Sequence, residues 1–87
     1  MNIIFSDHAI AKIEILKRHG IEIENKFIEL VVTEPEKLEE GYKKRLIAQR
    51  EFDDGHVLRV VYEKINNDIL IITIYPGRSK RYDKSEI

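Results

Sequence analysis

Strand-like patterns of apolar and polar residues dominate the second half of the chain. Three β-rich runs, RLIAQREF, VLRVVYEKI and ILIITIY, are separated by the turn-forming segments DDGH and NND. Short turns between such runs favour an antiparallel meander over residues 45–75. The third run is apolar at nearly every position, so we expect a central strand that is covered on both faces. Pro76-Gly77 is expected to end it.

Helical spacing characterises the first half. Ser6 is a good N-cap, and the apolar residues that follow recur three or four apart up to Gly20, which predicts a helix over 7–19. The same spacing predicts a second helix over 22–32, although no good capping residue precedes it. Thr33-Glu34-Pro35 ends that helix, because proline disfavours helical geometry in the residue before it.

The remaining segments complete a single domain over residues 1–87. We expect an edge strand at 1–5, a basic tail at 76–87, and either a loop or an exposed strand at 35–44. The apolar faces of the two helices are the natural cover for one face of the meander. The predicted fold is therefore α+β, with two N-terminal helices packed on an antiparallel sheet of three to five strands.

The amino-acid composition excludes several kinds of chemical site. The chain has no cysteine, which excludes disulfides, thiolate chemistry and the usual zinc frameworks. Its three histidines lie far apart in sequence, so we predict no metal site and no cofactor. No secretory signal or membrane-spanning run is evident, which favours a soluble cytoplasmic protein. Few glycines and prolines beside abundant Ile, Glu and Lys favour a thermophilic source.

Charge is distributed unevenly. Residues 1–40 hold five Lys/Arg against nine Asp/Glu, whereas residues 41–87 hold ten against seven. An anionic partner is therefore expected to prefer the sheet and the tail to the helices. The overall net charge of −1 is far from that of dedicated nucleic-acid binders.

The first hairpin offers a specific site hypothesis. If Asp54-Gly55 forms its tip, Arg50 and Arg59 face one another on the same side of the sheet. Two opposed arginines repel unless an anion or a carboxylate lies between them. The alternative is that both stems cross the sheet and put their charged ends in water, against Glu63 or Asp53.

Two further candidates come from the residues at the chain's ends. His8 lies in the first turn of the first helix, where the helix dipole favours a neutral imidazole that can exchange a proton. A packing role for it is the alternative. The tail places basic side chains around one aromatic ring, which is typical of an RNA contact, although a solvated terminus has the same composition.

The chain resembles a known superfamily. The segments FSDHAIAKIEILKRHGI, TEP, DGHVLRVVYE and IITIYPGRSKRY, within residues 4–82, are similar to the small toxin-like domains around RelE and BrnT, and more closely to an uncharacterised family among them. The resemblance implies two helices against a sheet of about four strands. It also implies a toxin-like RNA-binding protein or metal-independent endoribonuclease, neutralised by an antitoxin protein. Enzymatic activity itself is left open.

The resemblance also implies site residues. Arg59 matches the strand arginine that follows the turn and would hold a phosphate. Arg45 or Arg50 would assist from the preceding strand. Tyr82 or Tyr75 would stack on a base or share a proton. The residues that would neutralise charge are Arg78, Lys80 and Arg81.

A second functional hypothesis remains beside the first. The chain can be a non-catalytic module that uses a sheet edge or its basic face to bind an acidic segment of a partner protein. It can act as a monomer or as a weak homodimer through an exposed edge.

Overall fold

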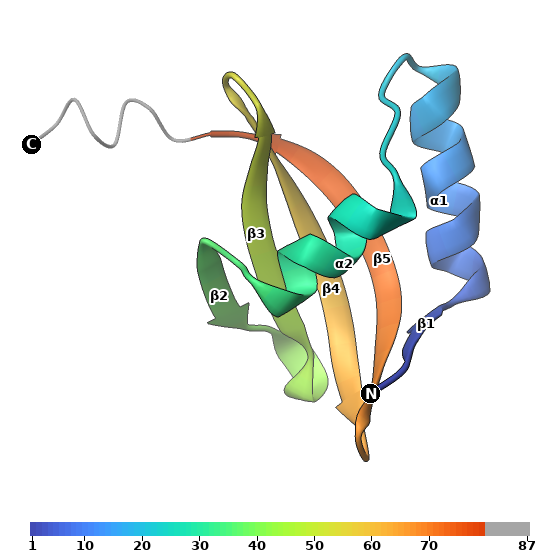
Figure 1. Ribbon diagram of the computed structural model, residues 1–87, viewed down its shortest axis with the longest axis vertical. Coiled ribbons are helices and arrows are strands. Elements are labelled where there is room, and N and C mark those ends of the chain that lie inside the picture. Colours follow the sequence, from blue (N-terminus) through green and yellow to red (C-terminus); the bar gives the residue numbers. More distant parts are fainter. Residues whose placement is uncertain (80–87) are drawn as a thin grey trace, which may run out of the picture.

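The computed structural model of this protein describes residues 1–79 (Figure 1). In this part of the chain, two helices lie on one side of a five-stranded sheet, which confirms the predicted α+β class. The elements in chain order are β1 (Ile3–Phe5), α1 (Asp7–Arg18), α2 (Asn25–Thr33), β2 (Lys37–Glu40), a 3₁₀ turn (Tyr42–Lys44), β3 (Leu46–Asp53), β4 (His56–Ile65) and β5 (Asp68–Arg78).

The sheet is mixed, with strand order β1-β5-β4-β3-β2. The predicted edge strand at the N-terminus is confirmed, but it runs parallel to β5, so the expectation of an antiparallel sheet was wrong in this respect. The other strand pairs are antiparallel. A parallel pair needs a long crossover between its strands, and here both helices and three strands lie between β1 and β5 in sequence.

Both predicted helices are present, and the boundaries of the first were predicted more accurately than those of the second. The first matches its predicted range to within one residue, because Ser6 caps it by accepting a hydrogen bond from the Ala9 N–H at 3.0 Å. The second begins at Asn25, three residues later than predicted. Ile23 lies in the segment between α1 and α2 and is buried there. Its distance in sequence from the apolar residues of α2 therefore matched helical spacing although the residue is not in the helix. Neither helix within residues 1–79 is long and apolar enough to cross a membrane.

One strand matches one of its two predicted alternatives, and another differs from its prediction. The 35–44 segment contains an exposed edge strand, β2, followed by a 3₁₀ turn. The last strand does not end before Pro76-Gly77 but continues to Arg78, so the basic tail begins later than predicted. Since β1 pairs only with Ile69–Ile71, the second half of β5 is an open edge, and proline is tolerated there.

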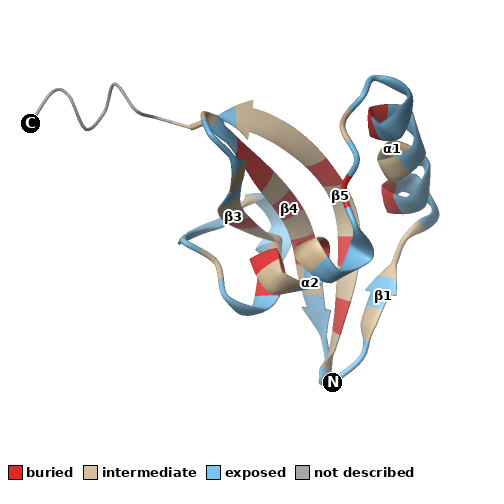
Figure 2. Cartoon of the chain, turned by 45° about the horizontal axis from the view of Figure 1, so that its top comes forward, coloured by how far each residue is buried: buried red, intermediate tan, exposed pale blue. Residues whose placement is uncertain are grey.

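The sheet has one covered face and one open face. The apolar run of β5 predicted a central strand covered on both faces, but β4 is the central strand and β5 is covered on one face only. Buried and half-buried residues follow one another along β5 and along β4 (Figure 2). Most of the buried ones form a core with buried residues of both helices, and this core includes Ala9, Val31, Leu58 and Ile74. We call the side away from the helices the open face. Half-buried residues on it are Ile47, Gln49, Arg59, Val61, Glu63, Leu70, Thr73 and Tyr75.

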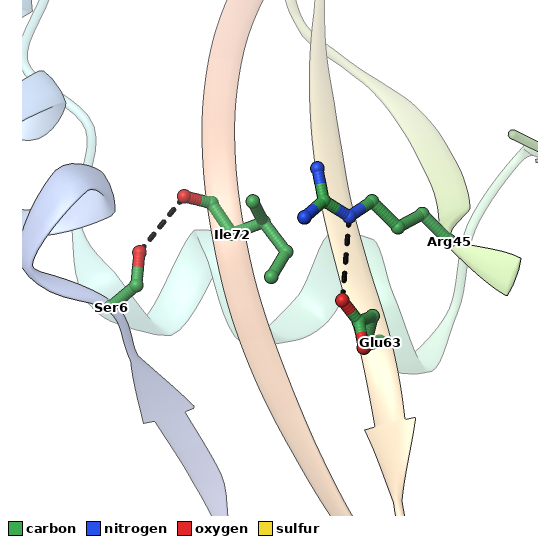
Figure 3. Close-up of polar contacts among 4 residues, drawn as sticks. All are labelled: Ser6, Arg45, Glu63 and Ile72. Atoms are coloured by element: carbon green, nitrogen blue, oxygen red, sulfur yellow. Dashed lines mark hydrogen bonds and ion pairs between the residues drawn. The ribbon is translucent and has the colours of Figure 1, made fainter. Parts of the chain in front are cut away.

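Ser6 joins the helical layer to the sheet. Ile72 is an extra residue in β5, because Val61 pairs with Thr73 and the next pair skips Ile72. A bulged residue is left out of the ladder, yet its carbonyl accepts a hydrogen bond of 2.8 Å from the Ser6 hydroxyl (Figure 3). One hydroxyl group therefore caps α1 and satisfies the bulge.

Replacing Ser6 by alanine tests this double role. We expect Ser6→Ala to lower the free energy of unfolding by about 2 kcal/mol, roughly half from the lost cap and half from the unpaired Ile72 carbonyl. Urea denaturation measures the loss, and Ser6→Thr, which keeps a hydroxyl, is the matched control. A loss below about 0.5 kcal/mol would show that water replaces both bonds.

A second prediction concerns alkaline pH. Tyr62 is only 3% exposed, and its burial raises the pKa of the phenol above the usual value of 10.0. The unfolded chain therefore releases this proton first, so the stability due to the neutral phenol is full below pH ~10 and is lost as pH rises above it. We expect the wild-type Tm to fall more steeply above that pH than the Tm of Tyr62→Phe.

The control for this pH effect is Tyr42, whose side chain lies at the surface with 82% exposure. Tyr42→Phe is expected to follow the wild-type curve of Tm against pH. Parallel curves for the wild type and Tyr62→Phe would contradict the raised pKa of Tyr62, because they would mean that this phenol titrates alike in the folded and the unfolded wild-type protein.

Candidate binding face of the sheet

The first hairpin has the predicted tip but not the predicted register. Asp54-Gly55 forms the turn and Asp53 pairs with His56 across it. The next residue of β3, Phe52, is a bulge without a partner in the ladder. Because the bulge adds one residue to β3, every pair beyond it is displaced by one position.

This displacement overturns the predicted pairing of Arg50 with Arg59. Arg59 lies opposite Gln49, and Arg50 lies opposite Leu58. Directly paired residues share a face of the sheet, and successive residues alternate between faces. Arg50 therefore lies on the helix-covered side with buried Leu58, while Arg59 lies on the open face. These two guanidinium groups do not converge on one patch.

Turn geometry and aromatic packing both account for the bulge. Gly55 has a φ of 93°, whereas Asp54 is not among the described residues with positive φ. The bulge-free two-residue turn of type I′ needs positive φ at both central residues. In addition, the Phe52 ring packs edge-on against Phe27 of α2, with 6.4 Å between the ring centroids. A hairpin with this bulge satisfies both constraints.

Arg50 has a structural contact instead of the predicted catalytic one. Its Nη1 donates a hydrogen bond of 2.6 Å to the carbonyl of Glu34, the residue that follows α2. Carbonyl groups at a helix C-terminus lack intrahelical partners and carry partial negative charge. Arg50 thus fastens the end of α2 to β3.

Arg59 and Tyr75, two of the predicted site residues, meet on the open face. They pair across β4 and β5, and the Arg59 guanidinium carbon lies 5.8 Å from the centre of the Tyr75 ring. Gln49 holds this guanidinium from the other side, because its Oε1 accepts a hydrogen bond of 2.8 Å from Nε. Among residues 1–79, Arg59 forms no ion pair. Its charge is therefore oriented by neutral groups.

Arg45 lies further along the same face and is paired. Its Nε lies 3.3 Å from Oε1 of Glu63, and the two side chains are 43% and 34% exposed (Figure 3). Figure 3 shows the Arg45 side chain extending from just before β3 toward β4. An ion pair at this exposure contributes at most about 1 kcal/mol. Glu63 therefore offsets the charge of Arg45 but does not hold the Arg45 side chain firmly in one position.

The other candidates lie elsewhere. His8 is exposed in the first turn of α1, on the side of the sheet that the helices cover. Arg78 is exposed at the end of β5, opposite His56. The tail candidates Lys80, Arg81 and Tyr82 lie outside the described residues.

A hydrogen-bonded pair at the hairpin tip escaped the sequence reasoning. His56 Nδ1 lies 2.7 Å from Oδ1 of Asp53, and both line a hollow of about 240 Å³ that Arg78 also borders. Both residues are about half exposed, and they are the closing pair of the hairpin. We interpret the contact as a turn-stabilising one.

The arrangement on the open face is suited to binding. Arg59 supplies a directed cation, Tyr75 an aromatic ring and Gln49 a polar anchor, while Glu63 is the carboxylate of the Arg45 ion pair. None of the three histidines lies on this face. Within residues 1–79, no three His, Asp or Glu side chains are grouped so as to hold a metal ion.

Comparisons with protein-family models, with curated proteins and with solved structures find no match to this chain.

Gly77 allows the Arg59 guanidinium to lie where it does. A Cβ at this position would collide with Nη1 of Arg59. We expect Gly77→Ala to displace the guanidinium from Tyr75 and Gln49, and to change stability by less than about 1 kcal/mol, because the displaced group is the end of a flexible side chain. Loss of the slowly exchanging Arg59 Nε–H signal in the NMR spectrum measures the displacement.

A double-mutant cycle provides the control. In an Arg59→Ala background, Gly77→Ala has no Arg59 side chain to collide with, so the contribution of the collision should vanish and only the backbone effect of replacing glycine should remain. An unchanged Nε–H signal in Gly77→Ala would contradict the predicted collision.

Proposed function

We propose that this protein is a toxin-like RNA-binding protein that holds single-stranded RNA on the open face of its sheet. The observation that carries the proposal is the contact of Arg59 with the Tyr75 ring on a face that no described helix covers. Neither group is used to bury the core, and both are half-exposed.

These side chains suit RNA in particular. A guanidinium group binds phosphate through planar, paired donors, and an aromatic ring stacks on an unpaired base. Sheets that present aromatic rings and cations are a recurrent platform for single strands. The basic excess of residues 41–87 and the resemblance to RelE and BrnT support the same partner.

We propose that the protein binds RNA and that the predicted pair of arginines does not cleave it. Cleavage of RNA without a metal needs a base near the 2′-hydroxyl and cations that share the phosphate. Arg50 and Arg59 lie on opposite faces and cannot share one phosphate. Cleavage through other groups remains an experimental outcome.

Fluorescence anisotropy with a labelled single-stranded RNA tests the proposal. We expect binding that weakens with salt, and roughly tenfold weaker binding for Arg59→Ala and Tyr75→Ala, since one base stack contributes about 1–3 kcal/mol. Tyr75→Phe should bind like the wild type, because the ring is retained. The control is Arg18→Ala, which removes an exposed arginine from α1.

Three outcomes would change this conclusion. If wild-type protein does not bind RNA at low salt, the proposed function is wrong. If Arg18→Ala weakens binding as much as Arg59→Ala, the RNA does not use the open face. RNA that is cleaved by the wild type and left intact by Arg59→Ala would restore the ribonuclease hypothesis.

A protein partner is the second candidate. The observation in its favour is the apolar content of the open face, where Ile47, Val61 and Leu70 are only half-buried and Ile4 is 49% exposed. A partner with an acidic, partly apolar segment, such as an antitoxin, would cover these residues and pair with Arg59. Co-purification of one acidic protein, together with no RNA binding, would favour this candidate.

A further inference from the structure

A hollow of about 460 Å³ lies where β2 turns into β3. Three basic side chains from two segments of the chain line it: Lys44 ends the 3₁₀ turn, Arg45 follows it and precedes β3, and Lys64 lies near the end of β4. The remaining lining residues are Glu40, Gly41 and Leu46. Basic residues thus outnumber the single acidic one.

The turn that forms one wall is strained. Lys43 and Lys44 have φ values of 57° and 64°, in the left-handed region that lysine seldom adopts. Each such residue destabilises the folded chain relative to one in an ordinary backbone conformation. Two backbone hydrogen bonds hold the conformation, from Gly41 N–H to the Arg45 carbonyl at 2.6 Å and from Arg45 N–H to the Tyr42 carbonyl at 3.2 Å. Strain of this kind gathers at ligand-binding sites.

The charges of the hollow are only partly compensated. Arg45 shares its charge with Glu63, whereas neither Lys44 nor Lys64 forms an ion pair within residues 1–79. Like charges that surround one hollow repel, and an anion between them relieves that repulsion. An ammonium group is a compact charge well suited to a phosphate.

We infer that this hollow is a phosphate-binding subsite for the backbone of the RNA; the inference rests on the proposed function. Arg45 connects the two regions, because it lies on the open face and also lines the hollow. From Arg59 to Glu63, the partner of Arg45, β4 advances four residues, or about 13 Å at 3.3 Å per residue. The bound strand therefore runs lengthwise along β4 as far as Arg45. Lys64 pairs with the buried Ile69 and so lies on the helix-covered side, which means that the strand reaches the hollow round the end of the sheet.

Removing both lysines tests the subsite with two probes. In the Lys44→Ala/Lys64→Ala protein, the slope of log affinity against log salt for the RNA should fall by roughly 1.4, about 0.7 for each lost phosphate contact. Pyrophosphate, titrated alone, should shift the amide NMR signals of Lys44, Arg45 and Lys64 in the wild type but not in this variant. The matched control, Lys17→Ala/Lys26→Ala, removes two exposed lysines from the helices.

The outcomes separate this inference from the function on which it rests. RNA binding with an unchanged salt slope in the variant, and no response to pyrophosphate, would overturn the subsite and leave the proposed function standing. A pyrophosphate response without any RNA binding would reject the proposed function and keep a site for small phosphate compounds. Equal displacement of the RNA by polyglutamate would show a general attraction for anions, which would also overturn the subsite.

Discussion

The register between β3 and β4 is the constraint on which the rest of the structure depends. Side chains alternate along a strand, so one extra residue exchanges the two faces for every residue beyond it. The bulge at Phe52 supplies that residue. It directs Arg50 to the end of α2 and leaves Arg59 on the open face beside Gln49 and Tyr75. One local irregularity in the ladder therefore determines which arginine lies in the candidate site.

The second bulge, at Ile72, shows how such an irregularity is accommodated. A residue left out of the ladder needs another partner for its carbonyl, and the Ser6 hydroxyl provides it at 2.8 Å. The same serine caps α1 and lies next to β1, whose pairing with β5 makes the sheet mixed. Helix, edge strand and bulge are thus joined at one residue. This joint fixes α1 over β5 and leaves the opposite side of β5 without a described helix.

Much of this arrangement could be predicted from local chemistry, and the rest depended on contacts between distant residues. The Ser6 cap and the Asp54-Gly55 tip are determined by residues adjacent in sequence, and both were predicted correctly. The bulge at Phe52 depends on packing against Phe27, which no local pattern reveals. The hollow beside Lys44 is lined by the end of β2 and the end of β4, which are distant in sequence, so no local pattern predicts it.

The distribution of charge and the position of the two helices together determine which side of the sheet an anionic chain can approach. The first forty residues, which include both helices, carry a net excess of acidic side chains, so the side of the sheet that the helices cover repels a polyanion. The opposite side has an arginine oriented by neutral groups, and its second arginine is only loosely paired with Glu63. A strand along β4 therefore meets Arg59 and the Tyr75 ring at one end of its path, Arg45 at the other end, and an apolar surface between them. Affinity on such a surface comes from stacking and from a few phosphates, which is consistent with binding by a protein of small net charge.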